Sequence, residues 1–208
     1  MKRATWYFDF ISPFAYLQWR RLRDERRLAL EPVPILFAAV LDHVGQKGPA
    51  EIPGKRTFTY RFVHWQARRA GVPLRFPPAH PFNPMAALRL SIAAGNAPRA
   101  IDAIYAHLWA EGRQGDDAAS LTPVARSLGI PDVAAAIGDA AVKAKLRENT
   151  DAAIAAGVFG VPTLVMDGQF FWGNDATEMA FEYAANPALF DDEEMKRIDG
   201  LPATASRK

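Results

Sequence analysis

The sequence predicts an α/β fold in which the two ends of the chain build one sheet and a long helical region is inserted between them. Apolar, aromatic-rich runs that suit strands occur at residues 4–10 and again at 158–172. The roughly one hundred residues between them show helical composition and no strand pattern. Each end alone has too few strands to close a core, which argues against two domains in tandem. We therefore expect a sheet domain of residues 1–40 and 157–190, a helical insertion of residues 41–156, and a solvated tail of residues 191–208.

The first elements lie in the stretch WYFDFISPFAYL, from Trp6 to Leu17. Its aromatic run suits a strand that stops at Ser12-Pro13, and the residues that follow suit a helix. Ser12 then takes the N-cap position and Pro13 the first helical position, where a missing N–H does no harm. Such a helix start directs free N–H groups and the positive end of the helix dipole toward the space above it, which favours an anion. On this motif alone, a capped helix without chemistry is the simpler interpretation.

The residues that follow predict a parallel strand–helix–strand unit and then a helical block. Residues 30–37 (LEPVPILF) suit a second strand whose prolines favour an edge, and residues 44–54 are rich in Gly and Pro and suit a loop. A helix over residues 55–70 ends at Gly71, and the five prolines of residues 73–84 predict a rigid connector. Further helices are expected at residues 85–94, 97–111, 121–128 and 133–156.

Strand character returns near the C-terminus. Residues 158–166 suit a strand, Asp167-Gly168 suits a hairpin turn, and residues 169–172 can pair back. Gly173-Asn174-Asp175 is expected to open a last helix that extends through Tyr183. From Asp191 the chain is acidic and then polar, so we expect it to be solvated and partly disordered.

Pro162 interrupts the strand predicted at residues 158–166. A proline at this place requires an edge, a bulge or a special turn, because it cannot donate to a sheet ladder. A cis peptide bond between Val161 and Pro162 is one solution, and an ordinary edge-strand proline is the alternative.

Charge and hydropathy disfavour two classes of partner. The 208 residues carry 25 basic and 23 acidic side chains, a formal charge of +2, so nothing global attracts nucleic acid or a membrane surface. No apolar stretch approaches the roughly 20 residues that span a bilayer, and no secretory signal is evident at the start. The expected location is therefore the cytoplasm.

The absence of cysteine limits the chemistry further. It excludes disulfide exchange, thiolate metal sites and a thiol nucleophile that belongs to the chain itself, so any thiol chemistry must use a sulfur from elsewhere. The four histidines have no metal-ligand spacing, so no metal site is expected. A solvent or capping role is expected for each histidine, namely His43, His64, His80 and His107.

The order of these elements resembles the thioredoxin fold: a strand, a helix with a reactive position at its N-terminus, and a later Val-Pro-Thr before a hairpin and a last helix. Ser12 stands where that fold has the first cysteine of its C-x-x-C motif, and Ala15 stands at the second. The chain resembles most closely the kappa-class glutathione transferases and the bacterial 2-hydroxychromene-2-carboxylate isomerases, which are DsbA-like thioredoxin folds with a helical insertion. The resemblance spans nearly the whole chain and is carried by residues 7–17, 53–62, 80–84 and 158–175.

This resemblance implies glutathione as cofactor. Its thiolate would lie over the helix start, stabilised by the helix dipole and by the Ser12 hydroxyl, which lowers the thiol pKa. The backbone of Val161, held open by a cis Pro162, would pair with the cysteinyl part of glutathione. The γ-glutamyl carboxylate would lie on the backbone amides of Asn174 and Asp175, with the Asp175 carboxylate available for the α-amino group. Ordinary N-capping is the alternative for both residues.

Further contacts are implied less directly. Trp172 belongs to the last matching block and is expected beside the cofactor. Lys55 and Arg56 are candidates for a carboxylate, either the glycine end of glutathione or that of the substrate, although either could be a solvated helix start. Asn83 is a further candidate for a polar contact with the substrate.

The last block favours the isomerases over the transferases. The resemblance therefore implies glutathione-dependent cis–trans isomerisation of 2-hydroxychromene-2-carboxylate to trans-o-hydroxybenzylidenepyruvate in naphthalene-type aromatic degradation, by a homodimer that acts on a small aromatic substrate. One alternative is a glutathione transferase or peroxidase that isomerises nothing. Another is a cysteine-free thioredoxin-fold module that only binds a partner.

Overall fold

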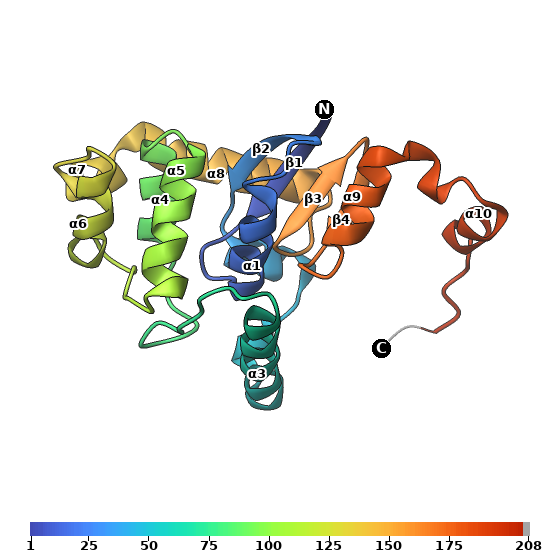
Figure 1. The fold of residues 1–208 in the computed structure, drawn as a ribbon, viewed down its shortest axis with the longest axis horizontal. Helices are drawn as coiled ribbons and strands as arrows, with labels where there is room; N and C mark the ends of the chain where they lie inside the picture. Colours follow the sequence, from blue (N-terminus) through green and yellow to red (C-terminus); the bar gives the residue numbers. More distant parts are fainter. Residues whose placement is uncertain (206–208) are drawn as a thin grey trace.

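A computed structural model describes residues 1–205 of the chain and has a four-stranded mixed sheet at its centre (Figure 1). The strand order is β2-β1-β3-β4, with β1 parallel to β2 and antiparallel to β3. In the central pair, Trp6 of β1 lies opposite Leu164 of β3. The four strands are β1 Lys2–Phe8, β2 Leu28–Pro34, β3 Thr163–Met166 and β4 Gln169–Trp172. The two ends of the chain therefore share one sheet, and the predicted α/β fold with a helical insertion is confirmed.

Side chains alternate along β1, and the inward-facing ones fill the core beneath the sheet. Trp6 and Phe8 point into the core, and neither is measurably exposed. The Trp6 ring stacks on Phe8 at 4.3 Å and on Trp19 of helix α1, Pro13–Leu22, at 5.3 Å. Each of these large side chains contributes about 1.5–3 kcal/mol or more by leaving water. The aromatic run that predicted the strand thus supplies the contact between the sheet and α1.

The segment between β2 and the long helix α3 differs from the prediction. β2 covers residues 28–34 and not 30–37, because helix α2, Phe37–Val44, begins where the strand was expected to end. The predicted loop at residues 44–54 contains a single turn of 3₁₀ helix, η1, Pro49–Glu51. Helix α3, Pro53–Arg69, matches the helix predicted at residues 55–70 to within two residues at either end.

The inserted region is helical, as predicted, but it is divided into more separate helices than the sequence indicated. Its elements are α4 Met85–Ala93, α5 Pro98–Tyr105, the π-helical turn η2 Ala106–Ala110, α6 Ala118–Ser127, α7 Val133–Gly138 and α8 Ala140–Ala155. The helix predicted at residues 133–156 is broken at Asp139, whose Oδ1 accepts the N–H groups of Ala141 and Val142 at 2.8 and 3.0 Å and so begins a new helix. α6 begins three residues earlier than predicted, because Asp117 caps it by accepting the Ser120 N–H at 2.7 Å.

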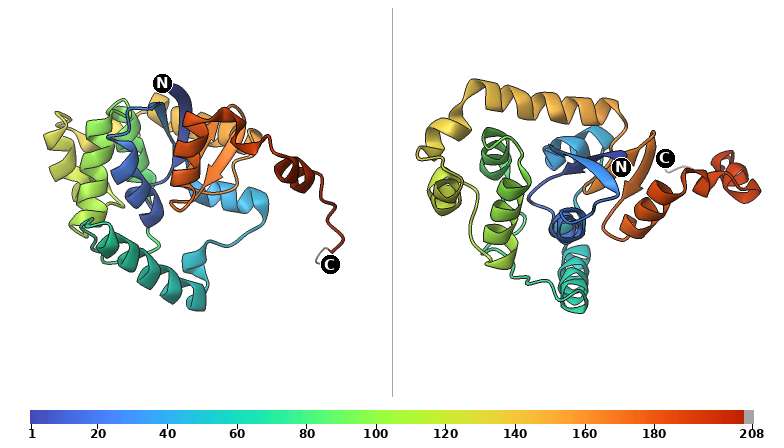
Figure 2. Two further views of the ribbon diagram at one scale, coloured as in Figure 1. Left: turned by 45° about the vertical axis from the view of Figure 1, so that its right-hand side comes forward. Right: turned by 45° about the horizontal axis from the view of Figure 1, so that its top comes forward.

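Figure 1 shows α4 to α7 grouped on one side of the sheet, α9 on the other side, and α3 projecting below. In Figure 2, α8 runs from the helical group back to the sheet, where it packs against β2 and α2. The sheet and the start of α1 therefore lie between the helical group and the C-terminal elements. No helix in residues 1–205 is both long and apolar enough to cross a bilayer.

The C-terminal elements begin later than predicted. Residues 158–162 form an irregular loop, so only the second half of the strand predicted at 158–166 is extended. The last predicted helix is α9, Thr177–Ala185. The segment from Asp191, expected to be solvated and partly disordered, contains an additional helix, α10, Glu193–Asp199, which follows a 3₁₀ turn, η3, Pro187–Phe190. The side chains of α10 are mostly exposed, as predicted, and the last residues of the predicted tail, 206–208, lie outside the described part.

Candidate functional site

The start of α1 presents two hydrogen-bond donors. Ser12 is the N-cap, as predicted, and its Oγ accepts the Ala15 N–H at 3.2 Å while its own N–H donates to the Asp9 carbonyl at 3.1 Å. Pro13 has no N–H, so Phe14 supplies the remaining donor of the first turn, and no partner for it is found among residues 1–205. The hydroxyl proton of Ser12 likewise has no acceptor in that part of the chain. Both donors lie at the positive end of the helix dipole.

Asp9 holds the loop between β1 and α1 in place. Its side chain is fully buried, Oδ1 accepts the Ile11 N–H at 3.0 Å, and Oδ2 accepts the Phe37 N–H at 2.9 Å. Burial raises the pKa of the Asp9 carboxyl to about 7, and the backbone hydrogen bonds oppose that rise. The sequence reasoning missed Asp9, although an acidic residue within an apolar run was a signal that could have identified it.

His80 braces the same loop from the proline-rich connector. Its Nε2 lies 2.9 Å from the Ile11 carbonyl oxygen, its Nδ1 lies 2.8 Å from the Tyr60 hydroxyl, and burial lowers the pKa of its imidazole. The solvent or capping role predicted for His80 is therefore wrong. It is also wrong for His107, which is buried and lies 2.7 Å from the Gln114 carbonyl oxygen through Nε2.

The other two histidines, His43 and His64, are exposed, in agreement with a solvent role. In the part of the chain that the structure describes, no group of three His, Cys, Asp or Glu side chains could hold a metal ion.

The loop before β3 lies beside this helix start. The Val161-Pro162 peptide is cis, and because Tyr7 pairs with Thr163, Pro162 lies beside the end of β1 from which the Ser12 loop departs. The Pro162 carbonyl accepts the Gly173 N–H at 2.9 Å. Neither the N–H nor the C=O of Val161 has a hydrogen-bond partner among residues 1–205. The loop thus offers one open backbone unit next to the α1 start.

Gln18, on α1, connects the helix to the loop between β4 and α9. Its Nε2 donates to the Gly173 carbonyl at 3.0 Å and to Thr177 Oγ1 at 2.9 Å, while its Oε1 accepts the Trp6 indole N–H at 2.8 Å. The bonds to Trp6 and Thr177 are buried and the bond to Gly173 is partly buried, so each is costly to leave unmade. Gln18 was also missed, because its partners are far away in the sequence.

The loop after β4 contains Asn174 and Asp175. The sequence predicted that these two residues open the last helix. This is wrong, because α9 begins at Thr177 and both residues precede it. Asn174 Nδ2 donates to Gln66 Oε1 of α3 at 3.5 Å, and Asn174 Oδ1 is buried without a partner in the described part of the chain. The Asp175 carboxylate lies over Gly173, where a β-carbon would overlap it.

Trp172 borders the cis-proline loop. Its side chain is 56% exposed, and its ring packs against Phe159 with the centroids 5.3 Å apart. A β-carbon on Gly160 would overlap the Trp172 indole, so glycine is needed for this close approach. Trp172 therefore stands beside the loop that carries Val161.

The three candidate substrate ligands are not brought into hydrogen-bond or ion-pair contact with Ser12 within residues 1–205. Lys55 is exposed in the first turn of α3. Arg56 donates through Nε to the Ala50 carbonyl, which occupies part of its guanidinium. Asn83 Oδ1 accepts the Met85 N–H at 3.0 Å before α4, so this oxygen already has a structural role.

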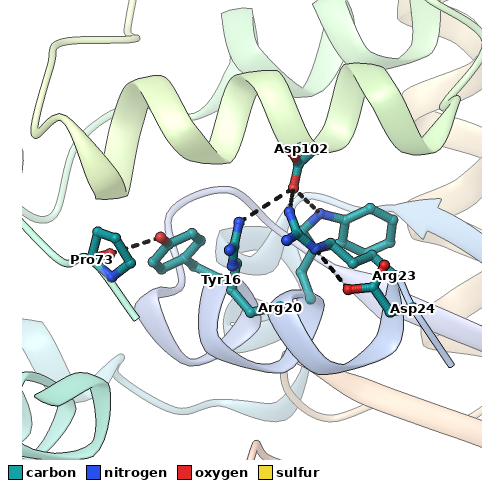
Figure 3. Close-up of polar contacts among 7 residues, drawn as sticks. Tyr16, Arg20, Arg23, Asp24, Pro73 and Asp102 are labelled. Carbon is teal, nitrogen blue, oxygen red and sulfur yellow. Dashed lines mark hydrogen bonds and ion pairs between the residues drawn. The ribbon is translucent and has the colours of Figure 1, made fainter. Parts of the chain in front are cut away.

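Polar contacts fix α1 to the inserted region (Figure 3). Asp102 of α5 accepts hydrogen bonds from Arg23 Nη1 at 2.6 Å and Trp19 Nε1 at 3.2 Å, and it lies 3.8 Å from Arg20 Nη1. Tyr16 donates to the Pro73 carbonyl at 2.7 Å. These contacts involve partners separated by tens of residues, and they hold the helix start against both the connector and the helical group.

Comparison with known proteins identifies the family. A family model described as the DSBA-like thioredoxin domain matches residues 5–184. The chain belongs to this family. Two relatives are similar to this chain over most of its length. A 2-hydroxychromene-2-carboxylate isomerase of Pseudomonas putida is 32% identical over 83% of this chain and 89% of its own. Glutathione s-transferase kappa 2 of Caenorhabditis elegans is 28% identical over 89% of this chain and 93% of its own.

Solved structures agree on the fold. A structure of 2-hydroxychromene-2-carboxylate isomerase superposes with a TM-score of 0.78 at 23% identity and covers 96% of this DSBA-like chain and 100% of its own. The resemblance inferred from Ser12, the Val-Pro-Thr loop and the last block is therefore confirmed at the level of family and fold.

Proposed function

We propose that the protein is a glutathione-dependent cis–trans isomerase that converts 2-hydroxychromene-2-carboxylate to trans-o-hydroxybenzylidenepyruvate in naphthalene-type aromatic degradation. One observation carries the proposal: the α1 start presents the Ser12 O–H and the Phe14 N–H beside the unpaired backbone of Val161, in a chain without cysteine. The isomerase and kappa-transferase relatives support the choice of reaction and of cofactor.

The residues present fit glutathione as a cofactor. An open backbone unit at Val161 suits the extended peptide part of the ligand, which can pair with it as an added strand. Asn174 Oδ1 is a buried acceptor without a protein partner, and buried polar groups of this kind are normally satisfied. We propose that Asn174 and Asp175 hold the γ-glutamyl end, and that Trp172 packs beside the ligand.

When bound, glutathione supplies a thiolate that can add reversibly to a conjugated enone, which allows rotation about the former double bond. The Ser12 hydroxyl and the Phe14 N–H stabilise the negative charge on the sulfur and so favour its deprotonation. Ser12 is therefore an activator and not the nucleophile. The proposed contacts for a carboxylate or polar group of the substrate remain Lys55, Arg56 and Asn83. The side chains of Arg56 and Asn83 already make hydrogen bonds within the protein, which leaves Lys55 the most available of the three.

The experiment is a turnover assay with purified protein and 2-hydroxychromene-2-carboxylate, with and without glutathione, together with a calorimetric titration of glutathione. We expect micromolar to millimolar binding and turnover that requires glutathione. Equal turnover in glutathione-free buffer would show the proposal to be wrong.

The likeness to a kappa transferase supports a second candidate, a glutathione transferase or peroxidase. Conjugation of a generic electrophile or reduction of a peroxide, without turnover of the chromene, would select it. No measurable affinity for glutathione would instead favour the cysteine-free binding module.

Three further statements stay predictions. The division into a sheet domain of residues 1–40 and 157–190, an insertion of 41–156 and a tail of 191–208 can be checked by limited proteolysis. The homodimer can be checked by light scattering, where a monomer would contradict it, and the cytoplasmic location by cell fractionation.

A further inference from the structure

One face of α3 carries a row of exposed aromatic rings. Phe58 and Trp65 are 66% and 50% exposed, and Phe62 lies half-buried between them. Phe58 stacks on Phe62 with the centroids 5.6 Å apart, and Phe62 stacks on Trp65 at 5.9 Å. Exposed apolar groups of this size in a continuous row are uncommon on a soluble surface and mark a binding site of some kind. We call Phe58, Phe62 and Trp65 the α3 aromatic row.

Cations occupy both ends of the row. Lys55 lies three residues before Phe58, and Arg69 lies four residues after Trp65, with its guanidinium 5.1 Å from the Trp65 ring centroid. At about 100° per residue, these five positions fall within an arc of about 80° on the helix. Arg56 is turned by about 100° from Lys55, toward the face that packs on the protein. The aromatic row therefore has positive charge at its ends and none of its own.

The row is continuous with the candidate site. The Phe62 ring lies 6.2 Å from the ring of Phe14, which is the residue that supplies the free N–H at the α1 start. One turn further along α3, Gln66 accepts the hydrogen bond from Asn174 of the β4–α9 loop. α3 therefore contacts the two segments that we assign to glutathione, and Phe62 makes the contact with the first of them.

We propose that the α3 aromatic row binds the ring of a small planar aromatic carboxylate, with Phe62 as a specificity-determining residue and Lys55 facing the carboxylate. This inference rests on the proposed function for the substrate class. Stacked rings favour a flat aromatic partner over an aliphatic one of the same size. A cation at the end of the row complements a carboxylate at the end of the ligand.

The dimensions favour a small molecule over a protein partner. From Phe58 to Trp65 the helix rises by about 10 Å, which matches one or two fused rings with a side chain. A stable protein interface buries about 800 Å² on each partner, much more than three side chains offer. The contact between Phe62 and Phe14 also places the middle of the row beside the donors at the start of α1.

The test is calorimetry on the full chain with two unreactive probes, 2-naphthoate and cyclohexanecarboxylate. We expect 2-naphthoate to bind more tightly than cyclohexanecarboxylate. Phe62→Ala should weaken 2-naphthoate binding by roughly three- to tenfold and leave cyclohexanecarboxylate nearly unchanged. Phe62→Tyr should restore the preference, and Lys55→Met should weaken both probes alike. His64→Ala, an exposed substitution on the same helix but off the row, is the matched control and should change neither.

Equal affinity for the two probes, no binding of 2-naphthoate at millimolar concentration, or equal effects of Phe62→Ala and His64→Ala would each overturn the inference. Because no glutathione is needed, these outcomes are separate from those of the turnover assay. If 2-naphthoate is preferred in a way that depends on Phe62, but the protein shows no glutathione-dependent turnover, the inference about the α3 aromatic row is supported and the proposed function is contradicted. Circular dichroism of each variant checks that α3 remains folded.

Discussion

The His80 Nε2 atom donates a hydrogen bond of 2.9 Å to the carbonyl oxygen of Ile11, the residue before Ser12. A carbonyl oxygen can only accept, so Nε2 carries a proton. The Tyr60 hydroxyl donates to the His80 carbonyl oxygen at 2.6 Å and also lies 2.8 Å from Nδ1. Burial lowers the pKa of His80, which keeps the imidazole neutral at pH 7. The connector and α3 thus fix the position of the loop that presents the candidate activator.

His80→Ala should reduce glutathione-dependent turnover by roughly tenfold or more, because the loop before Ser12 loses its support on one side. It should also lower the free energy of unfolding by about 2–4 kcal/mol through a lost buried hydrogen bond and lost aromatic packing. Steady-state kinetics and urea unfolding measure the two effects. His107→Ala is the matched control, since it removes a buried imidazole that bonds to a carbonyl oxygen away from the site. Equal loss of turnover in both variants would contradict a positioning role for His80.

Asp9 should make stability depend on pH. Its folded-state pKa of about 7 lies above the ordinary value of 3.8, mainly because of burial, so between these values the folded protein holds a proton that the unfolded chain has lost. The contribution of Asp9 to stability is thus fully present below pH 4 and is lost as pH rises toward 7. Tyr105 is its titratable neighbour, and burial raises the pKa of that phenol well above its usual range, so it stays neutral.

The measurement is urea unfolding of wild type and Asp9→Asn between pH 4 and pH 8. The wild-type free energy of unfolding should fall relative to that of the variant by on the order of 4 kcal/mol over this interval, since the amide cannot titrate. His80 acts in the opposite sense: its lowered pKa costs stability only as pH falls below 6.5, and it is common to both proteins. Parallel pH profiles for the two proteins would be inconsistent with a protonated Asp9.

Local chemistry made part of this site predictable. The Ser12 cap, the turn at Asp167-Gly168 and the special geometry at Pro162 depend on residues adjacent in sequence, and all three are present. The contact of Gln18 with Thr177 joins residues 159 positions apart, and that of His80 with Ile11 joins residues 69 positions apart, so no spacing in the sequence indicates them.

The starts of helices α2 and α9 could not be predicted from the sequence for a related reason. α2 begins where the Asp9 carboxylate accepts the Phe37 N–H, a contact between segments 28 residues apart. Likewise, α9 begins at Thr177 because Gln18 and the Asn174 carbonyl both bond the Thr177 hydroxyl, whereas Asn and Asp are good caps on local grounds. Tertiary contacts therefore decided where these helices begin.

Gly173→Ala should weaken glutathione binding. Gly173 has a φ of +91°, a β-carbon there would overlap the Asp175 carboxylate, and its N–H and C=O bond to Pro162 and Gln18. We expect a loss of roughly tenfold or more in affinity and a fall in stability of about 1–3 kcal/mol. Gly45→Ala is the matched control, because φ is +68° there but nothing lies within 4 Å of the added carbon. Calorimetry that gives the same glutathione affinity for both variants would contradict the assignment of this loop.

Ser12→Ala tests the centre of the proposed chemistry. The substitution removes one charge-assisted hydrogen bond to the sulfur, worth roughly 1.5–3 kcal/mol, so turnover at neutral pH should fall by about ten- to a hundredfold. The pKa of the bound thiol should rise for the same reason, and the rate should partly recover at higher pH, where the thiolate forms without help. The loss of the N-cap also lowers stability by about 1 kcal/mol.

A second variant separates those two effects. Asp117→Ala removes the N-cap of α6, whose carboxylate accepts the Ser120 N–H at 2.7 Å, and it should lower stability similarly while leaving turnover unchanged. A titration of the glutathione complex from pH 6 to pH 9, followed by the ultraviolet absorbance of the thiolate, reports the thiol pKa directly. Ser12→Ala should move that titration to higher pH, and Asp117→Ala should not. Wild-type turnover of Ser12→Ala across this range would show that the hydroxyl does not activate the sulfur.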